Sequence, residues 1–133
     1  MKYSSLLYFL CFMSFCFGQN DKKISTVETV QVLNNNKAEA IYYFQNNWKV
    51  LRDMAVAKGY IHSYSLIETT YTEEAPFHMM LMTTYIDEAQ YEQRETRFRE
   101  LIEAKGALEL LNEKTPNEFR KSVFSVDPGR HLN

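Results

Sequence analysis

AEAIYYFQNNWKVLRDMAVAKGYIHSYSL, residues 38–66, is the stretch that decides the fold of this chain. Its apolar side chains recur at alternating spacings of three and four residues, which places them on one face of a helix. The members of this stripe are Ile41, Phe44, Trp48, Leu51 and Ala55. Gly59 predicts the end of the helix, because glycine adopts the left-handed conformation of a helix C-terminus without a Cβ clash. From residue 60 the pattern has the period of two that is typical of a strand.

The two ends and the polar side of this helix are also predicted by single residues. Asn36 is the expected N-cap, since its side-chain carbonyl can accept a hydrogen bond from a free amide of the first turn. The charged residues Lys49, Arg52, Asp53 and Lys58 are expected mostly on the side away from the apolar stripe. We therefore expect that side to face solvent.

The rest of the chain supplies three more strands and a second helix. β-branched and apolar runs predict strands at 24–33, 77–86 and 121–126, in addition to the strand at 60–70. Asp87 and Gln90 form a capping-box pattern that starts a helix, and Gly106 ends it. A short helix is expected at 107–113, a turn at 115–117 and a loose tail after residue 126. The order β-α-β-β-α-β predicts an α+β domain with a ferredoxin-like antiparallel sheet and both helices on one face.

The hairpin between the second and third predicted strands implies a register. If it turns at Glu73 and Glu74, residues whose numbers sum to about 147 lie opposite each other. One face then carries Tyr60, His62, Tyr64, Leu66, Phe77, Met79, Leu81 and Tyr85, and the other carries Ile61, Ser63, Ser65, Ile67, Met80, Met82 and Ile86. Neither face is polar, so each needs a cover. We expect the helices on the serine face, where they can approach closely, and a second copy of the chain on the aromatic face, which predicts a homodimer.

The N-terminus predicts export. Lys2 precedes an apolar run at 6–17 that is short for a membrane span, and small residues at Cys16 and Gly18 suit a cleavage site. We interpret 1–18 as a signal peptide and 19–133 as a single domain, which makes the protein periplasmic or secreted. A retained membrane anchor is the alternative. Both cysteines, Cys11 and Cys16, lie in this segment, so disulfides and cysteine-based metal sites are excluded from the mature domain.

The charge of the mature chain argues against two classes of partner. Without Lys2, fourteen basic residues stand against seventeen acidic ones, a net charge of −3. Nucleic-acid-binding proteins carry a basic patch, and anionic lipid also attracts basic segments. We therefore expect no nucleic acid and, after cleavage of the signal, no membrane association.

Two segments carry a resemblance to a known family: NNWKVLRDMAVAKGYIHSYSLIE, residues 46–68, and TTYIDEAQYEQRETRF, residues 83–98. Together with the order of elements they resemble the dimeric α/β-barrel superfamily. That group includes antibiotic-biosynthesis-type monooxygenases, haem-degrading enzymes and small secreted bacterial proteins. The resemblance implies a ferredoxin-like protomer that dimerises into a barrel, and it rests on topology rather than on a catalytic signature.

Several residues are candidates for chemistry. Cofactor-independent oxygenases of the resembled fold use an Asn, a Trp and a His, so Asn47, Trp48 and His62 are the candidate catalytic residues; core packing is the alternative for Trp48. The candidate ligand-binding residues are Tyr60, His62, Tyr64, Met79 and Tyr85. In the predicted register His62 and His78 are too far apart to share a metal, so we expect no metal site.

These observations predict an exported homodimeric domain that binds a small apolar or aromatic ligand, without a cofactor. The alternative is a cofactor-independent monooxygenase or a haem-handling enzyme, in which His62 would be the axial ligand. A third hypothesis is a purely structural dimerisation module. Fold alone does not separate them, because function belongs to the site.

Overall fold

A computed structural model describes residues 21–133 of the chain. The predicted signal peptide lies outside the described residues. Four strands form one sheet: β1 (Ile24–Val32), β2 (Ser63–Glu68), β3 (Met79–Tyr85) and β4 (Arg120–Arg130). The helical segments are α1 (Lys37–Tyr43), the π-helical turn η1 (Phe44–Trp48), α2 (Lys49–Ala57), α3 (Glu88–Glu92), α4 (Arg94–Lys105) and α5 (Pro116–Phe119).

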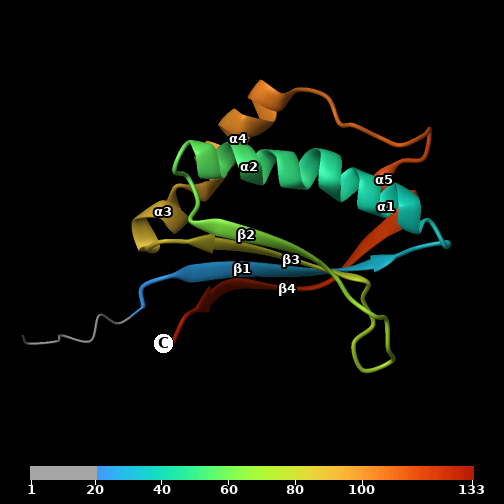
Figure 1. Cartoon of the computed structure of the whole chain (residues 1–133), viewed down its shortest axis with the longest axis horizontal. Coiled ribbons are helices and arrows are strands. Elements are labelled where there is room, and N and C mark those ends of the chain that lie inside the picture. The colour runs from blue at the N-terminus through green and yellow to red at the C-terminus, as the bar shows by residue number, and fades with distance from the viewer. Residues whose placement is uncertain (1–20) are drawn as a thin grey trace, which may run out of the picture.

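The strands run in the order β2-β3-β1-β4, and all three neighbouring pairs are antiparallel. Helices α1, α2 and α4 lie over the same face of this sheet (Figure 1). The architecture is a mixed α+β domain with an open four-stranded sheet, which is compatible with the ferredoxin-like fold that the sequence predicts. The hairpin register is confirmed: Ser63 lies opposite Thr84 and Leu66 opposite Leu81, so the paired residue numbers sum to 147.

The prediction of which sheet face the helices cover is wrong. Leu66, Met79 and Leu81 pack against Ala40 and Phe44 of the helical layer. The face with Ser63, Ser65, Ile67, Met80 and Met82 is the one without helices, because each of these residues alternates with the covered set. The physical reason is area: large side chains bury much more apolar surface under a helix than serines do, and this gain outweighs the closer approach that serines allow.

The first helix begins and ends where the sequence predicts, but the side chain of its N-cap residue has other partners than expected. Gly59 has a φ of +68°, and the hydrogen bonds Gly59 N to Val56 O and Tyr60 N to Ala55 O close the C-terminus. Asn36 is the N-cap residue of α1, as predicted, but the predicted side-chain cap bond is wrong, because Asn36 makes none. Its Oδ1 accepts instead from Lys114 Nζ at 2.7 Å, and its Nδ2 donates to Glu118 O at 3.0 Å. The asparagine joins the start of α1 to the segment before β4.

Predictions for the second half of the chain are confirmed at Asp87 and wrong further on. The Asp87 carboxylate accepts from Gln90 N at 2.9 Å, which starts α3 as expected. The helix predicted at 107–113 is absent from the structure, whereas the turn predicted at 115–117 is the start of α5. A capping box between Thr115 and Glu118 holds this short helix. The expected loose tail is part of β4, which continues to Arg130 opposite Ile24.

The core consists of two clusters at opposite ends of the covered sheet face. One contains Ile24, Ala55, Ile61, Tyr85, Tyr91 and Leu101, and the other contains Val30, Ala40, Phe44, Met79, Leu81 and Phe119. On the helix these clusters are separated by the turns from Phe44 to Ala55, and on β1 by the stretch from Ile24 to Val30. The space between the clusters is not filled by core side chains.

Candidate functional site

Two adjoining cavities occupy the space between the core clusters, under the helices. The first has a volume of about 390 Å³ and lies between α2 and α4 on one side and β1, β3 and β4 on the other. The second, of about 290 Å³, lies towards the start of the helix and the segment after α4. Five residues line both cavities: Glu28, Trp48, Leu51, Arg52 and Ile102. Cavities of this size are typical of small-molecule sites.

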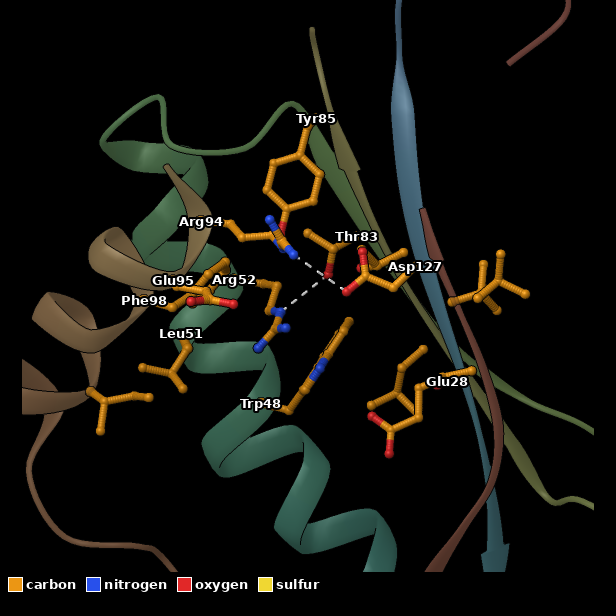
Figure 2. A pocket seen from close by; sticks show the side chains of 16 residues that line it. Glu28, Trp48, Leu51, Arg52, Thr83, Tyr85, Arg94, Glu95, Phe98 and Asp127 are labelled. Atoms are coloured by element: carbon orange, nitrogen blue, oxygen red, sulfur yellow. Dashed lines mark hydrogen bonds and ion pairs between the residues drawn. The ribbon is translucent and has the colours of Figure 1, made fainter. Parts of the chain in front are cut away.

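Arg52 is the central polar group of the first cavity (Figure 2). Its guanidinium carbon lies 4.3 Å from the ring centre of Trp48 and 4.5 Å from that of Phe98. Its Nε donates to Thr83 Oγ1 at 3.3 Å. Burial lowers the pKa of Arg52 to about 10, so the group is still charged at neutral pH. The prediction that Arg52 faces solvent is therefore wrong.

Arg94, the first residue of α4, brings a second guanidinium to the first cavity, and this one is paired with a carboxylate of β4. Arg94 lies 3.6 Å from a carboxylate oxygen of Asp127, and its guanidinium stacks 3.9 Å from the ring centre of Tyr91. The Tyr91 hydroxyl also donates to Asp127, and this bond raises the pKa of Tyr91. Figure 2 shows Arg94 and Asp127 on the Tyr85 side of the cavity. Arg94 and Asp127 are thus paired with each other.

Tyr85 and Trp48 are the predicted site residues that line the first cavity. Tyr85 is buried, and desolvation raises the pKa of its phenol, so it is a neutral hydroxyl in this site. Trp48 is half-buried and packs edge-on against Tyr64, with ring centres 5.7 Å apart. The tryptophan thus takes part in packing and also presents a surface to both cavities.

Asn47 lines the second cavity but has no free hydrogen-bonding capacity. Its Nδ2 donates to Tyr43 O at 2.9 Å and to Glu109 O at 2.7 Å. Its Oδ1 accepts from Lys105 Nζ at 2.9 Å and from Glu109 N at 2.8 Å. An amide side chain offers two donors and two acceptor positions, and all are used. This geometry gives Asn47 the role of holding the segment after α4 against the helix.

The remaining predicted residues lie outside these two cavities. His62 is exposed, just before β2, so its placement on an enclosed aromatic face is wrong. The hydroxyls of Tyr60 and Tyr64 donate to Glu100 and Asp53 on the outer surface. Met79 is buried in the second core cluster. His78 accepts from Val32 N at 2.9 Å through Nδ1, which is a structural role.

A haem with a histidine ligand does not suit the cavities. Neither set of lining residues includes a histidine, and His62, the residue expected to bind the iron, is on the outside. Within residues 21–133 no group of three or more His, Cys, Asp or Glu side chains is arranged to hold a metal ion. In the same part of the chain no helix has the length and apolar character needed to cross a membrane.

Sequence reasoning missed Arg52, Glu28, Phe98 and Arg120 as cavity residues. A signal for Arg52 was present, since it follows Trp48 by four positions and precedes Ala55 by three, and both spacings lie on the apolar stripe. Because Arg52 is charged, the prediction assigned it to the solvent side of the helix. Glu28 lies in the row of Leu66 and Leu81 across the sheet, which only the strand order reveals.

No protein-family model matches the chain, and no curated protein sequence does. The structure is similar to the crystal structure of HapK from Hahella chejuensis, with a TM-score of 0.50 over 82% of this chain and 92% of HapK. The two sequences are 13% identical, so the similarity concerns the fold alone.

Proposed function

We propose that this protein is an exported homodimeric domain that binds a small aromatic or apolar molecule in the first cavity. The observation that carries the proposal is the unfilled space of about 390 Å³ between the two core clusters. Trp48, Leu51, Tyr85 and Phe98 give it an aromatic and apolar lining. Ligand sites combine such a lining with a few placed polar groups, and here Arg52 and Thr83 supply them.

The proposed homodimer is supported by the sheet face without helices. Two rows of residues cross all four strands on this face: Ile67, Met80, Thr29 and Phe124, and Ser65, Met82, Val27 and Val126. None of these side chains is charged, and Ile67, Phe124 and Val126 are each more than 40% exposed. A two-fold interface pairs a surface with itself, so an uncharged apolar face suits a second copy of the chain. Sheet-to-sheet packing is also what the resemblance to dimeric α/β barrels implies.

Phe124→Asp tests this interface, with Leu111→Asp as the matched control. The two side chains are 49% and 48% exposed, but Leu111 belongs to the segment after α4, away from the sheet face. We expect sedimentation velocity at micromolar concentration to give a dimer for the wild type and for Leu111→Asp, and a monomer for Phe124→Asp. A wild type that sediments as a monomer would contradict the proposed dimer.

Export is proposed from the sequence pattern at 1–18, and it places the ligand outside the cytoplasm. The oxygenase alternative has less support. Of its three candidate residues only Trp48 faces the first cavity, because Asn47 is saturated and His62 lies outside. Ligand binding without turnover is therefore the function that the geometry favours.

The proposed site is tested by native mass spectrometry of the protein purified from cells that export it, without added ligand. Ile102 lines both cavities and is 53% exposed, so Ile102→Phe is expected to narrow the cavity without disturbing the core. Leu111→Phe is the control. A small molecule retained by the wild type and by Leu111→Phe, but lost from Ile102→Phe, would support the site; equal retention by all three would exclude it.

Tryptophan fluorescence is a second readout, and it detects binding even if the natural ligand is lost during purification. Trp48 is the chain's only tryptophan and lines both cavities, so no second tryptophan contributes to the emission. A panel of one- to three-ring aromatic compounds is titrated into the dimer. If none changes the emission and no molecule is retained in the mass spectrum, the binding function is wrong.

A further inference from the structure

The terminal nitrogens of Arg52, Nη1 and Nη2, form the free edge of its guanidinium. This free edge indicates the chemistry of the ligand in the proposed site. The guanidinium carbon lies 4.3 Å from the ring centre of Trp48 and 4.5 Å from that of Phe98. Within residues 21–133, Nε is the nitrogen of this side chain that makes a hydrogen bond, and its acceptor is the Thr83 hydroxyl at 3.3 Å. The two terminal nitrogens have no protein acceptor in that part of the chain. Nη1 and Nη2 are therefore available to a ligand that enters the first cavity.

The charge of Arg52 is also without an ion pair. Among the described residues no carboxylate oxygen lies within 4.0 Å of its nitrogens. Glu28 lines the same cavity, but Figure 2 shows it on the far side of Trp48. A desolvated charge without a partner is unfavourable, whereas stacking on two rings offsets only part of that penalty. An anion that approaches Nη1 and Nη2 would supply the missing partner.

The other charged groups of the two cavities limit how much negative charge a ligand can bring. Arg52, Arg94, Lys105 and Arg120 are the cations, and Glu28, Glu95 and Asp127 are the carboxylates. The balance of four against three leaves one positive charge, and Arg94 is already paired with Asp127. A singly charged anion therefore matches the cavity better than a doubly charged phosphate.

On the basis of the proposed function, we infer that the ligand is an aromatic carboxylate whose acid group binds the free edge of Arg52 through two parallel hydrogen bonds. A planar carboxylate matches the planar fork of a guanidinium, and this pairing is stronger than a neutral hydrogen bond. The ring system then lies against Leu51, Leu81 and Tyr85, which line the same cavity. Arg120, whose buried Nε has no partner, lies in the adjoining cavity and could meet a second polar group of a longer ligand.

The test compares acids with matched alcohols by isothermal titration calorimetry. The probes are benzoate, naphthalene-2-carboxylate and anthracene-2-carboxylate, each beside the corresponding arylmethanol. We expect the wild-type dimer to bind the best-fitting acid about 10- to 100-fold more tightly than its alcohol, as for a charge-assisted bidentate pair. Arg52→Met is expected to remove this preference, since methionine keeps an unbranched stem and loses the charge. Arg52→Lys, which keeps the charge without the fork, is expected to retain only part of it.

Arg97→Met is the matched control. Arg97 also stacks on an aromatic ring, 4.8 Å from the centre of Tyr60, but lines neither cavity, so its loss is expected to leave the preference unchanged. Equal binding of acid and alcohol by the wild type would overturn the inference and leave the proposed function standing. A preference that persists in Arg52→Met would also overturn it. If no probe binds, the proposed function fails together with the inference.

Discussion

Replacing Asn47 by alanine is expected to loosen the segment that closes the second cavity. The side chain is 3% exposed and makes four hydrogen bonds. Two of them, to the backbone N–H and C=O of Glu109, are the direct links between this residue and the segment after α4. Gly106 and Leu108 of the same segment line the second cavity. The sequence predicts Asn47 as a candidate catalytic residue, whereas the structure gives it a bracing role. This variant separates the catalytic role from the bracing role.

The magnitude follows from the partners that are lost. A protein hydrogen bond contributes about 0.5–1.5 kcal/mol net, so four bonds set an upper bound of roughly 6 kcal/mol. Glu109 is exposed and Lys105 is half-buried, which means that water can replace much of what they lose. Alanine also raises helix propensity by about 0.5 kcal/mol relative to asparagine. We therefore expect Asn47→Ala to lower the free energy of unfolding by about 2 kcal/mol.

The neighbouring Asn46 is the matched control. It makes one hydrogen bond, from Nδ2 to Tyr42 O at 2.9 Å within the same helix, and Asn46→Ala is expected to change stability by less than about 0.5 kcal/mol. Urea unfolding monitored by Trp48 emission measures both variants, and hydrogen exchange is expected to show faster exchange at 106–113 only in Asn47→Ala. Equal stability of the two variants, with unchanged exchange, would refute the bracing role.

Two further predictions concern the backbone and the pH dependence. Gly59→Ala is expected to destabilise the protein by about 1 kcal/mol in thermal unfolding; nothing lies within 4 Å of the added Cβ, so the effect comes from the φ of +68° alone. Hydrogen bonds from Lys49 and Tyr64 hold the pKa of Asp53 below its ordinary value of 3.8, so Asp53 stabilises the fold above that pH and loses its contribution as the pH falls through the lower folded-state pKa. We expect Asp53→Asn to be less stable than the wild type at pH 7, and we expect this difference to shrink as the pH falls through the lowered pKa of Asp53. A difference in stability that does not change with pH would contradict this assignment.

The sequence was sufficient to predict helix ends and the hairpin register, because residues close together in the chain determine them. Gly59 ends the helix because a positive φ favours glycine there, and the turn at Glu73 and Glu74 fixes every pair between β2 and β3. Asp87 starts α3 because an aspartate side chain can reach the amide of Gln90. In each case the determinant lies in the same helix end or hairpin as the structure that it determines.

The errors occur where distant segments compete for the same group. Asn36 could cap α1, yet its Oδ1 accepts from Lys114 Nζ at 2.7 Å, and Lys114 lies far away in sequence. The segment at 107–113 has the composition of a helix, but the side chain of Asn47 takes both backbone groups of Glu109 and holds the segment in an irregular form. Arg52 was placed by its charge, and only the positions of Trp48 and Phe98 show that two rings enclose it. These contacts depend on the tertiary structure and leave no local pattern.

The stability of Arg52→Met then decides whether the cavity is built for packing or for a ligand. The fall in the pKa of Arg52 from 12.5 to about 10 corresponds to a penalty of about 3 kcal/mol on the charged form. Stacking on Trp48 and Phe98 returns about 1–3 kcal/mol, so the guanidinium contributes close to nothing to folding. Methionine fills the same space without the penalty, and we expect the variant to unfold in urea at the same free energy as the wild type or up to about 1 kcal/mol higher. A loss above about 1 kcal/mol would make Arg52 a structural brace and would remove the basis for a ligand anion. Unchanged stability combined with a lost preference for the acid would mean that the charge is kept for binding, in a domain that has no disulfide to compensate for it.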